Sequence, residues 1–407
     1  MFEAIEQLPV EEMNSRHQAC RLLLDQLAPQ ASGLAVFSRL GIYYLTGTFG
    51  NGMFWLPREG APILLVRKGM ERARLESPLE AIVPYRSYSD YVRLCQEAGV
   101  PLGEVVAAEM GGLPWNLANL LTAKLPGVRF VPGDAVLSRA QAVKSPWELA
   151  KIRLAGQRHD HAVTGLLPGR IRPGMSEREV SHAIWGAFFE LGHTGMLRMG
   201  AHGEEIFLGH VSAGDSGNYP SVFNGPLGLR GEHPASPFMG YSGQIWGKGQ
   251  PLAVDCGFNL EGYNTDKTQV FWAGAPSSVP DQVRRAQDFC IAVQDWTAAH
   301  LRPGVAPSEI YAHCLDWARR EGLEEGFMGL GANKVPFLGH GIGLVIDAWP
   351  VLAKGFDDPL EEGMVLAVEP KMGIPGVGMV GVENTFEVTA EGGKCLTGAA
   401  FDLICLE

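Results

Sequence analysis

Residues 251–272 read PLAVDCGFNLEGYNTDKTQVFW, and this stretch decides the fold of the C-terminal part of the chain. An apolar approach, a Glu261-Gly262 turn signal and the β-rich run from Thr268 to Phe271 predict a β-hairpin. Asp255 and Asp266 lie on its two strands, about equally far from the turn, so we expect them opposite each other on one face. Two carboxylates held so close repel unless a cation lies between them. The alternative, a pair of solvated aspartates, is disfavoured by the apolar residues around Asp255.

Three more polar side chains stand in apolar runs further along the chain. His340 is flanked by glycines in FLGHGIGL, Glu369 follows the apolar run in GMVLAVEP, and Glu383 stands in GVENTFEVT. An unpaired carboxylate in such a run would be costly to bury. Taken alone, His340 is more typical of a hydrogen-bonded buried histidine than of a metal ligand. Together, two Asp, two Glu and one His form a donor set that suits Mn, Co or Zn ions.

The first third of the chain shows the pattern of a compact α/β domain. Short apolar runs predict strands at residues 33–38, 53–57 and 62–67, and amphipathic spacing predicts helices at 12–27 and 116–125.

A helix start then marks the boundary between two domains. Ser145 is placed as an N-cap, with Pro146 at the first helical position and Glu148 three residues after the cap. We therefore predict an N-terminal domain over residues 1–142 and a C-terminal domain over residues 143–407.

The C-terminal part contains an internal repeat. Ile171-Arg172-Pro173-Gly174 recurs as Leu301-Arg302-Pro303-Gly304, and at the same offset Glu179-Val180 matches Glu309-Ile310 and Gly192 matches Gly322. Each copy is a Pro-Gly turn followed by an amphipathic helix that ends at glycine. Chance is the alternative, but the coincidence of these features favours duplication. Two similar α+β halves would leave a cleft between them, which is a usual place for a site.

Composition limits the partners of the chain. The formal net charge of −12 argues against nucleic acid, because phosphate binding requires a basic surface. No run of about 18 apolar residues predicts a membrane span, and the glutamate-rich N-terminal segment does not fit a signal peptide. Seven scattered cysteines without a CxxC pair indicate reduced thiols. These features predict a cytoplasmic protein.

The ordered set of Asp255, Asp266, glycine-flanked His340, Glu369-Pro370 and Glu383 resembles the signature of the pita-bread metallopeptidases, which include prolidase, aminopeptidase P and methionine aminopeptidase. Segments 43–47 (YYLTG) and 144–146 (KSP) resemble those of the two-domain, prolidase-type and creatinase-type branch. The resemblance implies a creatinase-type N-terminal α/β domain, and a C-terminal α+β pita-bread domain with a pseudo-twofold internal repeat. It also implies a homodimer.

The resemblance further implies a Xaa-Pro peptidase that cleaves short peptides with two divalent metal ions, Mn, Co or Zn. Asp255 would hold one ion and His340 the other, and the remaining three carboxylates would be partly shared. The two ions would convert a bridging water into hydroxide near neutral pH. Glu369 and His340 are the implied catalytic residues, with Glu369 moving the proton toward the leaving amine.

The chain departs from the family pattern on the substrate side. Asp347 stands where a substrate-binding histidine is expected, Asn224 is the nearest match for a second, and Gly381 replaces an arginine. His210 and His233 lie near enough in sequence to compensate. These changes keep open a creatinase-like hydrolase of a non-peptide C–N bond acting on another small molecule. A non-enzymatic binding protein of the same fold is the weaker alternative, because all five ligands are present.

Overall fold

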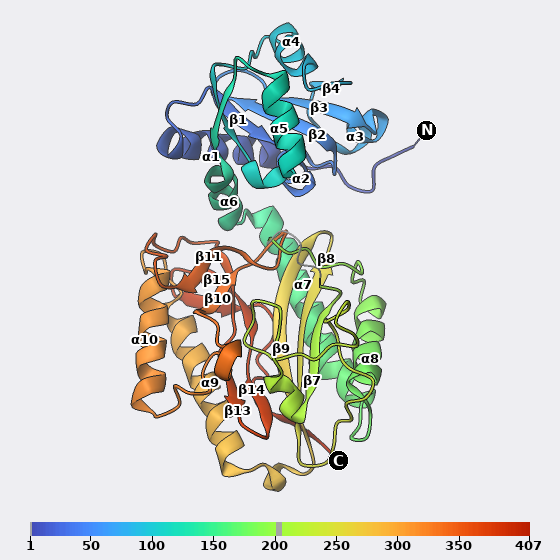
Figure 1. Cartoon of the computed structure of the whole chain (residues 1–407), viewed down its shortest axis with the longest axis vertical. Helices are drawn as coiled ribbons and strands as arrows, with labels where there is room; N and C mark the ends of the chain where they lie inside the picture. The colour runs from blue at the N-terminus through green and yellow to red at the C-terminus, as the bar shows by residue number, and fades with distance from the viewer. Residues whose placement is uncertain (1, 201–205) are drawn as a thin grey trace. The chain divides into compact units, whose positions relative to one another are not determined.

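The computed structural model describes residues 2–200 and 206–407. The chain forms two compact units, Met1–Gln141 and Ala142–Glu407 (Figure 1). Among the described residues, no helix is long and apolar enough to cross a membrane.

The N-terminal unit is built on a six-stranded mixed sheet with the order β4-β3-β2-β1-β5-β6. Its strands are β1 (Gly33–Val36), β2 (Asn51–Pro57), β3 (Ile63–Lys68), β4 (Ile82–Pro84), β5 (Val105–Ala108) and β6 (Arg129–Pro132). Its helices are α1 (Val10–Leu27), α2 (Arg39–Thr46), α3 (Met70–Glu76), α4 (Asp90–Glu97), α5 (Trp115–Lys124) and α6 (Asp134–Ala142). The three strands and two helices predicted for this part are confirmed to within two residues at each end.

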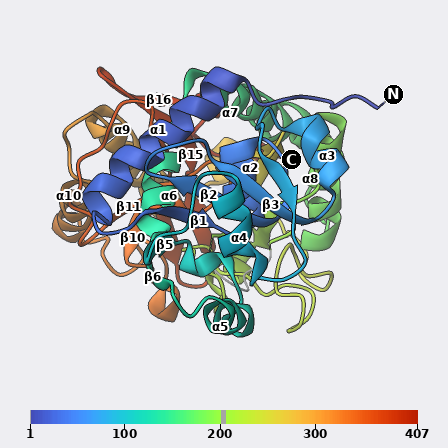
Figure 2. The ribbon, with the colours of Figure 1, turned by 90° about the horizontal axis from the view of Figure 1, so that it is seen from above.

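The alternation of side chains along the strands explains why helices cover both faces of this sheet. Ala35, Trp55 and Leu65 belong to the same apolar cluster as Tyr91 of α4 and Leu121 of α5. Their neighbours in sequence are equally buried and, because side chains along a strand alternate between faces, point the other way. Figure 2 shows α1 and α2 on one side of the strands and α4 and α5 on the other.

The long helix α7 (Pro146–Asp160) begins as predicted. The Ser145 side chain accepts a hydrogen bond from the Glu148 backbone N–H at 3.2 Å, and the Glu148 carboxylate accepts one from the Ser145 N–H at 3.1 Å. Two of the orphan donors at the helix start are therefore satisfied by this capping box.

The predicted internal repeat is present in the backbone. Helix α8 spans Glu177–Glu190 and helix α10 spans Pro307–Arg320, so both ends are shifted by 130 residues (177 to 307 and 190 to 320). The glycine before each helix has a left-handed backbone, with φ of 96° at Gly174 and 91° at Gly304. The C-terminal unit therefore contains two related halves.

Each half pairs a sheet with helices. The first sheet has the order β17-β9-β8-β7, and the second has the order β11-β10-β12-β15-β16 beside a separate β13-β14 hairpin. The strands of the first are β7 (Gly209–Ala213), β8 (Pro251–Leu260), β9 (Tyr263–Ala273) and β17 (Ile404–Leu406). The others are β10 (Phe337–Gly341), β11 (Ala348–Ala353), β12 (Val365–Val368), β13 (Lys371–Ile374), β14 (Gly378–Gly381), β15 (Asn384–Thr389) and β16 (Gly392–Cys395).

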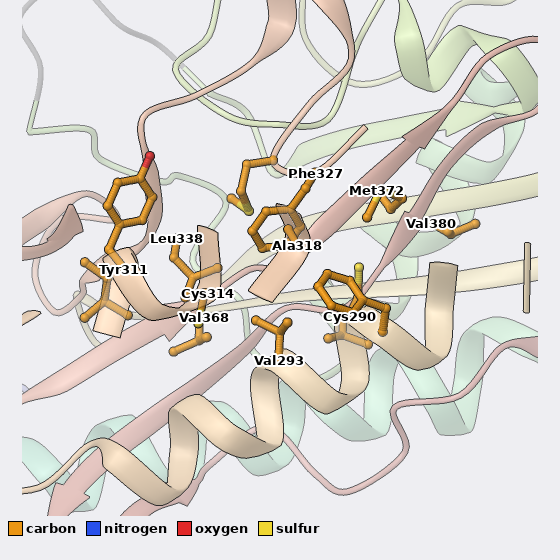
Figure 3. Close-up of a cluster of buried hydrophobic side chains, with 14 of the residues drawn as sticks. Cys290, Val293, Tyr311, Cys314, Ala318, Phe327, Leu338, Val368, Met372 and Val380 are labelled. Carbon is orange, nitrogen blue, oxygen red and sulfur yellow. The ribbon is translucent and has the colours of Figure 1, made fainter. Parts of the chain in front are cut away.

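Separate apolar cores hold the helices against the two sheets. Helices α7 and α8 pack on the first sheet, whereas α9 (Asp281–His300) and α10 pack on the second (Figure 1). Figure 3 shows Val293 of α9 and Cys314 of α10 gathered with Leu338 and Val368 of the second sheet.

The two sheets meet between β9 and β15. The Thr385 hydroxyl accepts a hydrogen bond from the Asp266 N–H at 2.8 Å and donates one to the Asp266 carbonyl at 3.0 Å. The Thr268 N–H donates to the Glu383 carbonyl at 3.2 Å. This seam, defined by Asp266, Thr268, Glu383 and Thr385, brings carboxylates of the two halves together.

The capping box at α7 yields a stability prediction. Replacing Ser145 with alanine leaves the Glu148 N–H without its side-chain acceptor and should lower the free energy of unfolding by about 1 kcal/mol. Urea denaturation followed by circular dichroism measures the change. The exposed Ser277, which carries no cap, is the matched control. Its alanine variant should stay within about 0.5 kcal/mol of the parent protein, and an equal loss in both variants would contradict the prediction.

Candidate metal centre

Asp255 and Asp266 lie on the β8–β9 hairpin, on the same face of the sheet. The Leu260–Tyr263 pair closes the turn, and this register places Asp255 opposite Thr268 and Asp266 opposite Gly257. The expectation that the two aspartates sit directly opposite each other is therefore wrong, because the turn fixes them two residues out of step. They are diagonal neighbours, whose Cα atoms in an antiparallel pair are about 7–8 Å apart. That separation leaves room for a cation between the carboxylates.

The second half of the unit supplies the other three predicted ligands. His340 lies on β10, Glu369 directly follows β12, and Glu383 directly precedes β15. All five side chains line one cavity of about 220 Å³. The glycines beside His340 allow this packing: a Cβ at position 339 would come within 2.2 Å of the Ala367 carbonyl oxygen. The structure thus brings together every predicted ligand.

The His340 ring is oriented for metal binding. Its Nδ1 lies 3.1 Å from the Gly341 carbonyl oxygen, which can only accept, so Nδ1 carries the proton. Nε2 therefore presents its lone pair to the cavity, 3.7 Å from Glu369 Oε1. Ligand atoms of Asp266, His340 and Glu383 all lie within 4.8 Å of one another. A backbone acceptor that fixes the histidine tautomer is the usual second partner of a metal-binding imidazole.

Lys371 is a component of the site that the sequence analysis missed. Its Nζ lies 2.7 Å from Glu383 Oε2, 3.0 Å from Glu369 Oε2 and 3.2 Å from Asp255 Oδ2, and the side chain is 1% exposed. The sequence hints at its burial, because Lys371 lies two residues after Glu369 at the start of an apolar run. Such a lysine is ordinarily read as solvent-exposed.

The charges in the cavity are unequally compensated. Burial, together with the neighbouring Asp255 carboxylate, raises the pKa of Asp266 to about 7. Burial also opposes ionisation of Asp255, but Lys371 and His210 outweigh it and hold the pKa of Asp255 below its usual value. Burial and Asp266 raise the pKa of Glu383 well above its usual value, despite the contact with Lys371. Compensating positive charge is therefore lacking on the Asp266 side of the cavity.

The donor set fits a divalent ion on that side. Asp266, His340, Glu369 and Glu383 offer the carboxylate and imidazole ligands that such ions accept. On the Asp255 side, the Lys371 ammonium already contacts the carboxylates that a second ion would need. The site as it stands fits one ion better than two.

The two candidate substrate-binding residues line the same cavity. Asn224 is exposed at its edge, and Asp347 is partly buried, with its Oδ1 accepting a hydrogen bond from the Gly200 N–H. His210 also lines the cavity; burial lowers its pKa to about 4, so its ring is neutral near pH 7. His233 lines a different pocket.

Gly381 lies directly across the β13–β14 hairpin from Lys371. Its φ of 132° and the 2.4 Å that would separate a Cβ from the Pro370 carbonyl oxygen leave no place there for a larger residue. The positive charge in this region therefore comes from the facing strand.

Comparison with known proteins identifies the families that have this two-domain architecture. Residues 150–390 match metallopeptidase family M24, and residues 16–143 match the creatinase/prolidase N-terminal domain. The chain belongs to metallopeptidase family M24. The predicted family and fold class, a creatinase-type α/β domain followed by a pita-bread domain, are thereby confirmed.

The relatives of this M24 chain described next cover between 73% and 98% of it. It is 24% identical over 367 residues to the Xaa-Pro dipeptidase of Pyrococcus furiosus, covering 90% of this chain and 93% of that one. It is 30% identical over 298 residues to the Xaa-Pro dipeptidase of Lactobacillus delbrueckii subsp. lactis, covering 73% and 71%. The crystal structure of dipeptidase PepE from Mycobacterium ulcerans superposes with a TM-score of 0.78 at 22% identity, covering 98% and 99%.

The raised pKa of Asp266 predicts how the stability of the metal-free protein changes with pH. The pKa of Asp266 rises from 3.8 to about 7 on folding. The stability that this shift gives the folded state is therefore fully present below pH 3.8 and is lost as the pH rises through about 7. Between roughly pH 5 and 8, the thermal midpoint of the metal-stripped parent protein should fall relative to Asp266→Asn, which has no proton to lose. Asp288→Asn, at an exposed position, should run parallel to the parent. Parallel profiles for Asp266→Asn as well would contradict the prediction.

Proposed function

We propose that this M24 chain is a metal-dependent hydrolase of short peptides with proline beside the scissile bond. The observation that carries the proposal is the convergence of Asp266, His340, Glu369 and Glu383 in one buried cavity. Relatives named Xaa-Pro dipeptidases support the choice of substrate. Apolar side chains in the cavity wall, among them Phe223, Phe337 and Val351, offer a surface for a proline ring.

The four cavity ligands Asp266, His340, Glu369 and Glu383 would hold the divalent ion, with Mn, Co or Zn all compatible with the donor set. When bound, such an ion polarises the scissile carbonyl and makes a coordinated water more acidic. The second ion predicted from the sequence would need Asp255, and its binding would require the Lys371 ammonium to leave its three carboxylates.

Individual side chains would transfer the proton, orient the metal ligand and bind the substrate. Glu369 has one oxygen on Lys371 and the other facing His340, so this second oxygen can take a proton from the attacking water and deliver it to the leaving amine. The Gly341 carbonyl keeps the His340 lone pair directed into the cavity. Asp347 places a carboxylate on the cavity wall, where it complements the α-ammonium group of a short peptide, and Asn224 offers an amide at the edge.

A second candidate is a creatinase-like hydrolase of a non-peptide C–N bond. It is favoured by the carboxylate of Asp347 on the cavity wall and by the internal ammonium of Lys371, which reduces the dependence on two ions. Guanidino acids and cyclic amidines carry the positive charge that an aspartate would bind. Turnover of these compounds and of no peptide would favour this candidate.

The proposal also covers the cellular location and the partners of the enzyme. All seven cysteines are unpaired thiols, which supports a reducing, cytoplasmic location. A homodimer, short-peptide substrates and no role for nucleic acid remain our expectations for its partners, the last because of the net charge of −12.

Metal-stripped protein reloaded separately with Mn, Co and Zn should cleave Xaa-Pro dipeptides or longer Xaa-Pro peptides. Replacing Glu369 with glutamine removes the proton acceptor and should lower kcat by about a hundredfold or more. Glu362→Gln, at an exposed position, is the matched control and should keep full activity. Intact metal-loaded protein that cleaves no peptide would overturn the proposal, and full activity in Glu369→Gln would remove the role given to that residue.

Asp347 yields a separate prediction about substrate binding. In Asp347→Asn, the loss of a charged partner should raise KM for peptides with a free amino terminus by about tenfold, with a smaller change in kcat. N-acetylated versions of the same peptides are the comparison, because they lack the ammonium group. An equal KM in parent and variant for the free-amine peptides would contradict the assigned contact.

A further inference from the structure

Lys371 is held as a fixed internal cation. Its ammonium group has three N–H donors and three carboxylate oxygens around it, one each from Asp255, Glu369 and Glu383, at 3.2, 3.0 and 2.7 Å. All of its hydrogen-bonding capacity is therefore used by acidic groups. This is the coordination that a small cation would otherwise have at the same place.

The backbone that carries this side chain is held on both sides. The Lys371 carbonyl accepts a hydrogen bond from the Met328 N–H at 2.9 Å, and Lys371 pairs with Gly381 across the β13–β14 hairpin. Because the side chain is only 1% exposed, an ammonium group displaced from the carboxylates would stay buried without partners, which is costly.

The carboxylates are divided between the ammonium and the rest of the cavity. Glu383 Oε2 accepts hydrogen bonds from both the Lys371 ammonium and the Thr268 hydroxyl. Glu369 likewise has Oε2 on Lys371 and Oε1 facing His340. Asp266 has no contact with the ammonium, and it groups with His340 and Glu383 instead. Glu369 and Glu383 thus lie between the Lys371 ammonium on one side and the Asp266 and His340 side chains on the other.

Charge counting agrees with this division. Four carboxylates bring a formal charge of −4. Two divalent ions with a bridging hydroxide leave −1, and one divalent ion with the lysine ammonium and a neutral water also leaves −1. The lysine therefore replaces an ion and the deprotonated water together, without changing the net charge of the cavity.

We infer that the Lys371 ammonium takes the place of one of the two metal ions, so that each chain binds a single divalent ion through Asp266, His340, Glu369 and Glu383. The inference rests on the proposed metal dependence of this site. The metal centre would then be mononuclear, with the Lys371 ammonium as its second positive charge.

Metal content tests the inference without any activity assay. The full-length protein is stripped, dialysed against excess Mn²⁺ or Zn²⁺ and measured by elemental analysis. We expect one ion per chain in the parent, two in Lys371→Gly, and one in the surface control Lys354→Gly. If Lys371→Gly does not fold, Lys371→Ala opens most of the same space and should also bind two. His340→Ala should lose the single ion of the parent.

Electron paramagnetic resonance of the Mn²⁺-loaded proteins gives a second readout. The parent should show the spectrum of an isolated Mn²⁺ ion, and Lys371→Gly that of a spin-coupled pair. Two ions in the parent, none in the parent, or only one in both Lys371 variants would overturn the assignment.

Peptide cleavage is scored separately, so the two proposals fail independently. One ion and no cleavage would overturn the peptidase function alone, whereas two ions with cleavage would overturn the assignment of Lys371 alone.

Discussion

Mutual repulsion among four carboxylates, three of them buried and Asp255 partly buried, is the constraint on which the rest of this site depends. Asp255 and Asp266 come from one sheet, and Glu369 and Glu383 come from the other. Burial alone would keep such groups protonated, so the cavity needs positive charge wherever a carboxylate is to stay ionised. Lys371 supplies it on one side, and on the other side the fold leaves an arrangement of ligands suited to a divalent ion. The seam between β9 and β15 holds both sides in place.

The two halves of the C-terminal unit contribute different chemistry to a common plan. Their equivalent helices α8 and α10 pack on separate sheets through separate apolar cores. The first half provides a hairpin with two aspartates, and the second provides His340 and the two glutamates. A site built between two rigid sheets keeps its ligands at fixed distances, because neither core has to deform to form it.

Local patterns made much of this predictable. The hairpin, the start of α7 and the glycine-flanked His340 each depend on a few neighbouring residues whose propensities agree. Two features were not predictable in this way. The diagonal placement of Asp255 and Asp266 depends on the turn register, which the sequence did not define to the residue. The role of Lys371 depends on three carboxylates up to 116 positions away (255 to 371), and charge alone does not indicate burial.

A lysine is synthesised with the chain, and no chelator can remove it. The carboxylates of Asp255, Glu369 and Glu383 therefore keep one counter-charge in metal-poor surroundings, as well as during synthesis, before any ion has been acquired. In many small metal-binding domains, ion binding and folding are coupled. A site that carries part of its own counter-charge does not need an ion for these three carboxylates to be compensated when the seam between the sheets closes.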